Sequence, residues 1–153
     1  LVDPQYHVEK IRAIRELCAS LDYPLFVNAR TDVYLGGLLD ESRQLGEAIS
    51  RAQQYLEAGA DGIFVPGMID AEAIAVFARE IPCPVNIYAL PGVPPASTLR
   101  ELGIARVSLG CGPLQSALAH VDGIAQAVGR SGTWSSFTEN WLGYPQAVAV
   151  CAG

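Results

Sequence analysis

Charged residues, long apolar runs and basic clusters are all scarce in this chain of 153 residues. Charged residues make up only 17% and hydrophobic residues 50%, a balance that excludes a disordered chain. No apolar run approaches the ~20 residues of a membrane-spanning helix, so we expect a soluble protein without a membrane partner. Lys and Arg number 10 against 16 Asp and Glu, and without a positive patch we expect no nucleic-acid partner.

The four cysteines lack the spacing of a metal site or of a disulfide framework. Cys18, Cys83, Cys111 and Cys151 lie far apart, with no CxxC pair and no paired histidines nearby. We therefore expect reduced thiols and a cytoplasmic protein. No charged segment followed by an apolar one opens the chain, which predicts no signal peptide. Because the chain begins at Leu1 rather than Met, we expect it to be a piece of a longer protein.

The sequence does contain a regular alternation of amphipathic segments with short apolar runs. Apolar residues that recur every three or four positions predict helices, and these begin near Asp3-Pro4, Glu41, Asp70, Ser97 and Pro113. The apolar runs predict buried strands at 25–29, 61–67, 84–88 and 105–109. This alternation predicts the α/β class, a parallel sheet of βα repeats with right-handed crossovers and helices on both faces.

Polar residues stand where the predicted strands end, and parallel α/β folds collect functional groups at that edge. The first strand leads into Asn28, Arg30, Thr31 and Asp32. A guanidinium there is costly unless Asp32 or an anionic ligand pairs with it. We therefore predict that Asn28 and Arg30 bind a ligand and that Thr31 and Asp32 support them. Asn86 interrupts another apolar strand, and either a structural hydrogen bond or a ligand would satisfy its amide.

Other candidates have simpler explanations. The glycine turn 110–112 lacks the third glycine of a dinucleotide-binding pattern, so tight-turn geometry explains it better than a phosphate site. Cys111 has no histidine nearby in sequence and is expected to be a small buried residue rather than a nucleophile. His7 and His120 fall on predicted helices away from the strand ends and receive no catalytic role. Asp61 precedes a strand and is expected to be a turn or cap residue.

Four segments in combination resemble the isocitrate lyase and phosphoenolpyruvate mutase superfamily. They are Phe26-Val-Asn-Ala-Arg30-Thr-Asp32, Arg51-Ala-Gln-Gln-Tyr-Leu-Glu-Ala-Gly-Ala-Asp-Gly62, Pro84-Val-Asn86 and Leu102-Gly-Ile-Ala-Arg-Val-Ser-Leu-Gly110. The match runs from about Val2 to Val128 and resembles only the C-terminal half of the family's barrel. The resemblance implies strands five to eight of a (β/α)8 TIM barrel over residues 1–129. Residues 130–153 are expected to form a C-terminal extension.

The resemblance also implies an activity. It implies an enzyme that makes or breaks C–C or P–C bonds of small α-keto or α-hydroxy carboxylates, or phosphonates, with Mg2+ and through an enolate. Arg30 would be the catalytic residue that grips the substrate carboxylate or the developing enolate, and Asn86 would line the pocket. Homo-oligomers are implied as well, often with the last barrel helix exchanged between subunits.

Two departures from the family pattern leave an alternative open. Pro66 stands where the lyases carry a glutamate, which argues against methylisocitrate-type activity. The family's acidic metal ligands and mobile catalytic loop belong to the N-terminal half, so we expect no metal ligand in this chain and no activity from the chain alone. The alternative is a catalytically inactive half-barrel that self-associates or acts as an interaction module, because an open sheet leaves unpaired edges. A phosphate or nucleotide binder at 110–112 is the least supported reading.

Overall fold

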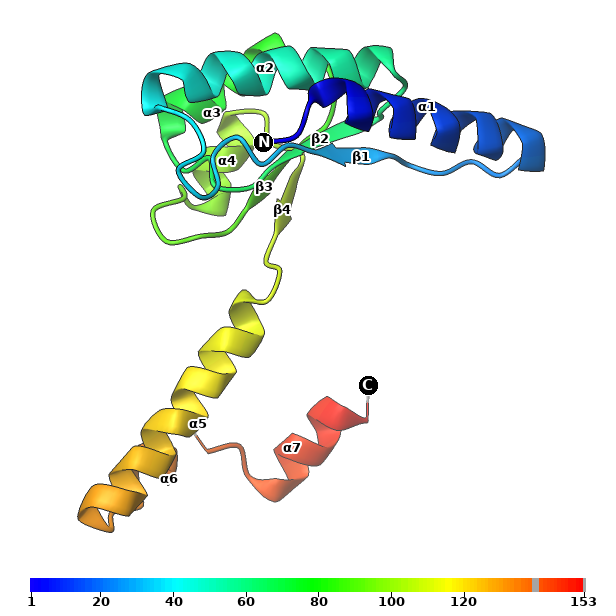
Figure 1. Cartoon of the computed structure of the whole chain (residues 1–153). Helices are drawn as coiled ribbons and strands as arrows, with labels where there is room; N and C mark the ends of the chain where they lie inside the picture. The colour runs from blue at the N-terminus through cyan, green and yellow to red at the C-terminus, as the bar shows by residue number, and fades with distance from the viewer. Residues whose placement is uncertain (139–140, 153) are drawn as a thin grey trace. The chain divides into compact units, whose positions relative to one another are not determined.

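The computed structural model describes residues 1–138 and 141–152. The chain divides into two compact units, Leu1–Gly110 and Cys111–Gly153. The first unit contains α1 (Pro4–Leu21), β1 (Asn28–Arg30), α2 (Glu41–Glu57), β2 (Gly62–Val65), α3 (Ala71–Glu80), β3 (Val85–Tyr88), α4 (Ala96–Glu101) and β4 (Arg106–Ser108), as Figure 1 shows. The second contains α5 (Gly112–Ser131), α6 (Ser135–Thr138) and α7 (Tyr144–Cys151). The boundary between a half-barrel of residues 1–129 and an extension of residues 130–153 remains a prediction. Residues 139, 140 and 153 of that extension lie outside the described residues.

The four strands form one parallel sheet in the order β1-β2-β3-β4, which confirms the α/β class. Right-handed crossovers between consecutive strands place the connecting helices on one face, because the strand order never reverses. The expectation that helices cover both faces is therefore wrong. This one-sided arrangement is the one that a barrel requires, with helices outside and the other face inside.

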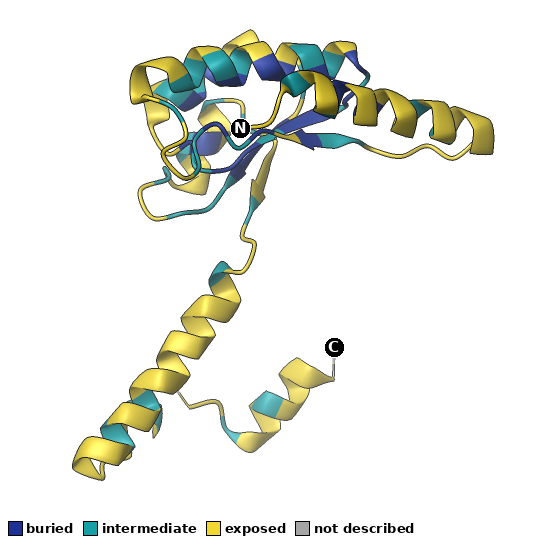
Figure 2. Cartoon of the chain, in the orientation of Figure 1, coloured by how far each residue is buried: buried dark blue, intermediate teal, exposed yellow. Residues whose placement is uncertain are grey.

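The core lies between the sheet and the helices, as the dark blue residues of Figure 2 show. Alternate strand residues point to opposite faces, so one residue in two enters the core. The buried hydrophobic strand residues are Ala29, Ile63, Val65, Val85 and Ile87. They pack with helix residues, of which Ile11, Ala52, Tyr55, Ile74 and Phe77 are fully buried. This packing fixes which strand residues face away from the helices.

Most element ends follow their sequence signals. The carboxylates of Asp3 and Asp70 each accept a backbone N–H at 2.8 Å and cap α1 and α3 as expected. Gly59 has a φ of +107° just after α2 and supplies the predicted C-terminal glycine. Ser97 is not the cap of α4: Pro95 takes that position with an extended backbone, and Ser97 lies within the helix. The first strand starts at residue 28 rather than 25, so Asn28 begins β1 and does not lie at its end as expected.

An ion pair secures the edge where the strands begin. Arg15 of α1 pairs with Asp61, and it also donates hydrogen bonds to the carbonyls of Gly59 at 2.6 Å and Leu25 at 2.7 Å. The backbone N–H of Val27 donates to the Asp61 carboxylate at 2.7 Å. Asp61 is therefore the structural turn residue that the sequence predicts, on the side of the sheet opposite the strand ends.

We expect the contribution of Asp61 to stability to disappear in acid. Burial opposes ionisation, but the Val27 N–H and the Arg15 guanidinium outweigh it and hold the pKa of Asp61 below its ordinary value. A depressed carboxyl pKa stabilises the fold above about pH 4, and this gain is lost as the pH falls through the folded-state pKa. The Tm difference between wild type and Asp61→Asn should therefore narrow from about pH 6 to about pH 3 in thermal melts. Glu80→Gln is the control, because Glu80 pairs with Arg79 on the surface. A Tm difference between wild type and Asp61→Asn that stays constant with pH would contradict the prediction.

Helix α5 of the second unit carries no buried residue. Leu114, Leu118 and Val121 recur at helical spacing and are exposed, so they form an apolar stripe along the largely yellow helix of Figure 2. Within the described part of the chain, no helix has the length and apolar character needed to cross a membrane.

Candidate functional site

Four residues form a row across the face of the sheet that the helices leave open. Arg30, Phe64, Asn86 and Arg106 are register partners on β1, β2, β3 and β4. Register partners in parallel strands point to the same face, and on β1, β2 and β3 the core residues Ala29, Ile63, Val65, Val85 and Ile87 are their neighbours along the strands. We call these four residues the polar row. It places two guanidinium groups and one amide on the open face.

Arg30 ends β1 and keeps part of its guanidinium available. Its Nε donates to Asp32 Oδ1 at 2.5 Å, and its central carbon lies 5.7 Å from the Phe64 ring centroid. The side chains of Arg30 and Asp32 are 51% and 45% exposed, so their ion pair adds little to stability. No described residue accepts a hydrogen bond from the two Nη groups of Arg30. These groups can bind an anion without breaking a structural contact.

A cavity of about 540 Å³ adjoins the end of β1. Arg30, Thr31 and Asp32 line it together with His7 and residues of α2. Thr31 is 3% exposed, and its backbone N–H donates to the Phe64 carbonyl at 3.0 Å. Its Oγ1 is buried without a hydrogen-bond partner among the residues that the structure describes. The structure thus brings three of the predicted site residues to one cavity.

His7 also lines this cavity, although its helix position suggested a place away from the strand ends. The difference arises because α1 runs beside α2, with the His7 and Tyr55 ring centroids 4.7 Å apart. Burial and the positive charges of Lys10 and Arg51 lower the pKa of the His7 imidazole below its ordinary value. His7 is therefore a neutral wall residue at neutral pH. His120 lies exposed on α5.

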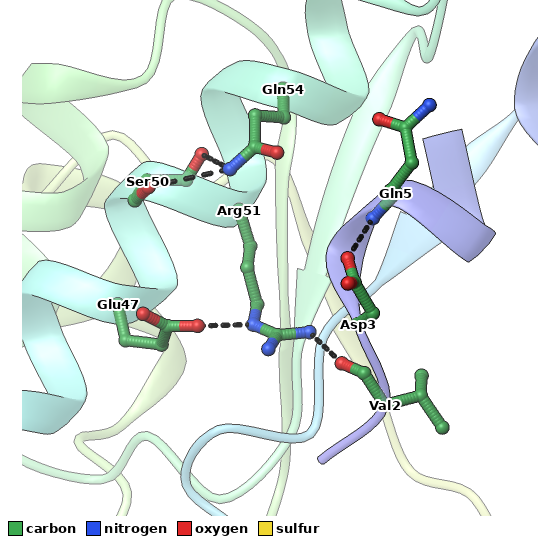
Figure 3. A network of polar contacts seen from close by, with 7 residues as sticks. All are labelled: Val2, Asp3, Gln5, Glu47, Ser50, Arg51 and Gln54. Carbon is green, nitrogen blue, oxygen red and sulfur yellow. Dashed lines mark hydrogen bonds and ion pairs between the residues drawn. The ribbon is translucent and has the colours of Figure 1, made fainter. Parts of the chain in front are cut away.

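Arg51 of α2 holds the segment before α1 against the rest of the unit (Figure 3). It is 6% exposed; its Nε donates to Glu47 Oε1 at 2.7 Å and its Nη1 to the Val2 carbonyl at 2.9 Å. Burial alone would lower the pKa of Arg51, but hydrogen bonds with Glu47 and Tyr55 outweigh it and raise the pKa above its ordinary value. The charged guanidinium is thus a structural wall of the cavity.

A smaller cavity of about 190 Å³ brings the two predicted asparagines together. Asn28 and Asn86 line it with Phe26 and Arg106. Asn86 is 3% exposed, and its Oδ1 accepts a hydrogen bond from Ser108 Oγ at 3.1 Å. This contact is the structural hydrogen bond that the sequence left as one of two possibilities. Arg30 shares the polar row with Asn86 but lines the other cavity.

Arg106 and Phe64 were missed because neither lies at the end of a strand nor interrupts an apolar run with a buried amide. Arg106 begins its strand, and Phe64 is the third residue of β2. The signal that could have found Arg106 is the alternation of polar Arg106 and Ser108 with apolar neighbours. That alternation predicts a polar face on β4.

Two loops carry glycines for geometric reasons. Gly67 follows Pro66 after β2, has a φ of +89°, and a Cβ there would lie 2.8 Å from the Tyr34 carbonyl oxygen. Gly110 has a φ of +54° and closely approaches the Tyr88 ring. Cys111 is exposed rather than buried, so that expectation is wrong, because the helix that starts beside it buries no residue.

The described residues offer no metal centre. Among positions 1–138 and 141–152, no three or more His, Cys, Asp or Glu side chains are grouped to hold a metal ion. The Mg2+ implied by the resemblance does not fit a set of ligands in this part of the chain.

Comparison with known sequences identifies the family. The sequence profile of phosphoenolpyruvate phosphomutase matches residues 1–129. An uncharacterized protein of Mycobacterium tuberculosis H37Rv is 41% identical over 128 residues, which are 84% of this chain and 46% of that protein. An oxaloacetate decarboxylase of Pseudomonas syringae pv. tomato is 34% identical over 106 residues, which are 68% of this chain and 34% of the enzyme. The chain thus spans about half or less of the length of these relatives.

Comparison with solved structures agrees. A candidate lyase/mutase from Burkholderia cenocepacia J2315 is 30% identical with a TM-score of 0.88, over 100% of this chain and 54% of that one. Phosphonopyruvate hydrolase, solved with oxalate and Mg2+, shares the fold at 22% identity and a TM-score of 0.69, over 99% of this chain and 53% of that one. With the profile match over residues 1–129, these findings show that the chain belongs to the phosphoenolpyruvate phosphomutase family, within the phosphoenolpyruvate mutase and isocitrate lyase superfamily.

Proposed function

We propose that this chain is the C-terminal half of a Mg2+-dependent enzyme that makes or breaks a C–C or P–C bond of a small α-keto or α-hydroxy carboxylate. The observation that carries the proposal is Arg30, which presents unpaired Nη groups at the carboxyl end of β1, on the open face of the sheet. The family membership and the oxaloacetate decarboxylases among the relatives support it. Because the chain spans only part of these relatives, the proposal concerns a protein of their full length that contains this chain, called the full-length protein below.

The role of Arg30 follows from charge. Cleavage of a bond next to a keto group leaves negative charge on an enolate, and a fixed guanidinium stabilises that charge most where water is excluded. The two Nη groups present parallel donors that match a carboxylate. Asp32 fixes the guanidinium through Nε, and the Phe64 ring lies against it. Arg30 would therefore bind the substrate carboxylate or the developing enolate.

The asparagines would orient the substrate. Asn28 and Asn86 line the smaller cavity, which includes Asn86 and Arg106 of the polar row and lies near the starts of the strands. Because Ser108 engages Oδ1 of Asn86, the amide orientation is fixed before a substrate arrives. A fixed amide costs less entropy on binding than a free one. Both side chains would select a substrate that can accept or donate hydrogen bonds.

We propose in addition that the full-length protein requires Mg2+, is cytoplasmic and forms homo-oligomers. The family membership and the Mg2+ bound to the structurally related hydrolase support the metal. Its ligands would come from outside the residues described above.

A second candidate function has its own observation. Within the described chain β1 and β4 each pair with one strand only, so the sheet has two open edges and an open face. Such edges favour association with another chain or copy. The alternative is therefore a catalytically inactive half-barrel that self-associates or serves as an interaction module.

Oxaloacetate turnover tests the proposal. Oxaloacetate decarboxylases are among the relatives, so oxaloacetate is the first substrate to test. We expect the full-length protein to release pyruvate from oxaloacetate with MgCl2 and to stop when EDTA is added, measured with coupled lactate dehydrogenase. Heat-denatured protein with the same MgCl2 corrects for decarboxylation by the metal alone. No enzymatic release from oxaloacetate or phosphonopyruvate would contradict the proposal. The inactive half-barrel would then be favoured if residues 1–153 alone formed a stable self-associated form.

A further inference from the structure

We propose that His7 is a positioning residue of the same site. While its imidazole is neutral, Asp32 stays paired with Arg30, and once the imidazole gains a proton it competes with Arg30 for Asp32. The inference rests on the proposed function and adds a control on the guanidinium that would bind the substrate anion. It comes from the cavity at the end of β1, which His7, Arg30 and Asp32 line together.

Asp32 is the group for which a protonated His7 competes. Of the described residues that line the cavity, Asp32 alone carries a carboxylate. Its Oδ1 accepts a hydrogen bond from Arg30 Nε at 2.5 Å, and both side chains are about half-exposed. An ion pair at this exposure is weak, and a carboxylate shared by two cations holds each of them less firmly. A second cation in the cavity therefore loosens the orientation of Arg30.

Packing keeps the His7 ring at this place. Its centroid lies 4.7 Å from that of the Tyr55 ring, at an interplanar angle of 48°. Tyr55 is 2% exposed and belongs to the core, so it is a fixed support for the imidazole. His7 thus changes its charge beside Asp32, and histidine is the side chain whose ordinary pKa allows this change in mild acid.

The charged and titratable groups around His7 come from three elements. They are Lys10 on α1, Glu47, Arg51 and Tyr55 on α2, and Arg30 and Asp32 at the end of β1. Burial, Lys10 and Arg51 lower the pKa of His7, whereas Asp32 raises it. Glu47 accepts a hydrogen bond from Arg51 Nε at 2.7 Å and is already paired. Asp32 is therefore the carboxylate that a protonated His7 meets.

Oxalate binding at two pH values provides the test. We would titrate oxalate into the full-length protein with MgCl2 by calorimetry at pH 7.5 and pH 5.5. The loss of affinity on acidification should be about fivefold larger for wild type than for His7→Gln, because the neutral glutamine cannot compete for Asp32 and one surface ion pair is worth about that factor. Protonation of any other group affects both proteins alike and cancels in this comparison.

Controls make each outcome decisive. His120→Gln removes the other histidine of this chain, which is exposed on α5, and should keep the full wild-type loss. If His7→Gln does not fold, His7→Phe keeps a ring against Tyr55 without a titratable group and should behave as expected for His7→Gln. Equal losses for wild type and His7→Gln, or a smaller loss for wild type, would overturn the inference. Failure of wild type to bind oxalate at either pH would instead refute the proposed function.

NMR titration of His7 in the full-length protein tests the competition without any ligand. Arg30→Met frees Asp32 and should raise the pKa of His7, whereas the same substitution in an Asp32→Asn background should leave that pKa unchanged. A rise of the same size in both backgrounds would show that the Arg30 charge acts on His7 directly. That result would overturn the inference even if oxalate binds as the proposed function requires.

Discussion

Arg30→Met is expected to lower kcat/KM of the full-length protein for its keto-acid substrate by about 1,000-fold. Loss of one donor to a developing oxyanion commonly costs 100-fold to 1,000-fold, and Arg30 would supply two donors and a full charge. Folding should be unaffected, because the side chain is 51% exposed and its ion pair with Asp32 is a surface pair. Steady-state kinetics and a thermal melt of the same sample check both parts.

Two variants separate the role of Arg30 from a general charge effect. Arg79→Met removes an equal charge from an exposed pair with Glu80 and should leave kcat/KM unchanged. Asp32→Asn keeps the guanidinium but weakens its orientation, so its effect should be smaller, about tenfold. An Arg30→Met protein that folds and turns over at the wild-type rate would refute the catalytic role.

Arg51→Met is expected to destabilise the first unit by about 3 kcal/mol. The guanidinium is buried and joins Glu47 on α2 to the Val2 carbonyl, two segments that are far apart in sequence. Its removal leaves a half-buried carboxylate and a carbonyl without their donor, and each loss costs more than an ordinary hydrogen bond contributes. Urea denaturation followed by circular dichroism measures the free energy of unfolding.

Two further variants on α2 separate the contribution of the Arg51 contacts from that of its charge. Arg43 lies exposed at the start of α2, and Arg43→Met should change the free energy of unfolding by less than about 0.5 kcal/mol. Arg51→Lys keeps the charge and loses one of the two hydrogen bonds, so we expect an intermediate cost. If Arg43→Met and Arg51→Met lower the free energy of unfolding equally, the contacts of Arg51 with Glu47 and Val2 in Figure 3 contribute nothing to stability.

The fold could be predicted where the signals are local. Apolar runs and helical spacing predicted all four strands and the helices between them, because each element buries one recognisable face. Asp3, Asp70 and Gly59 act at helix ends as expected, since capping depends on neighbouring residues. The prediction that helices cover both faces of the sheet was wrong, because the covered face depends on the order of the strands, which no single segment encodes. Ser97 failed as a cap because Pro95 determines the helix start.

The candidate site could be predicted only in part. Arg30, Thr31 and Asp32 were found because they lie at the end of a strand, and the structure gathers them at one cavity. Arg106 required the register between β3 and β4, which is a property of the assembled sheet. His7 reaches the same cavity through packing of α1 on α2, a contact between segments far apart in sequence. The roles of these residues remain predictions.

Oxalate binding to the full-length protein tests the central claim most directly. Oxalate resembles the enolate form of pyruvate in charge and shape, so it reports on the site before any turnover. We predict by calorimetry that oxalate binds in the presence of MgCl2, that EDTA abolishes binding, and that Arg30→Met weakens it at least 100-fold. Binding that is absent, or that is indifferent to both Mg2+ and Arg30, would contradict the proposed function of this chain.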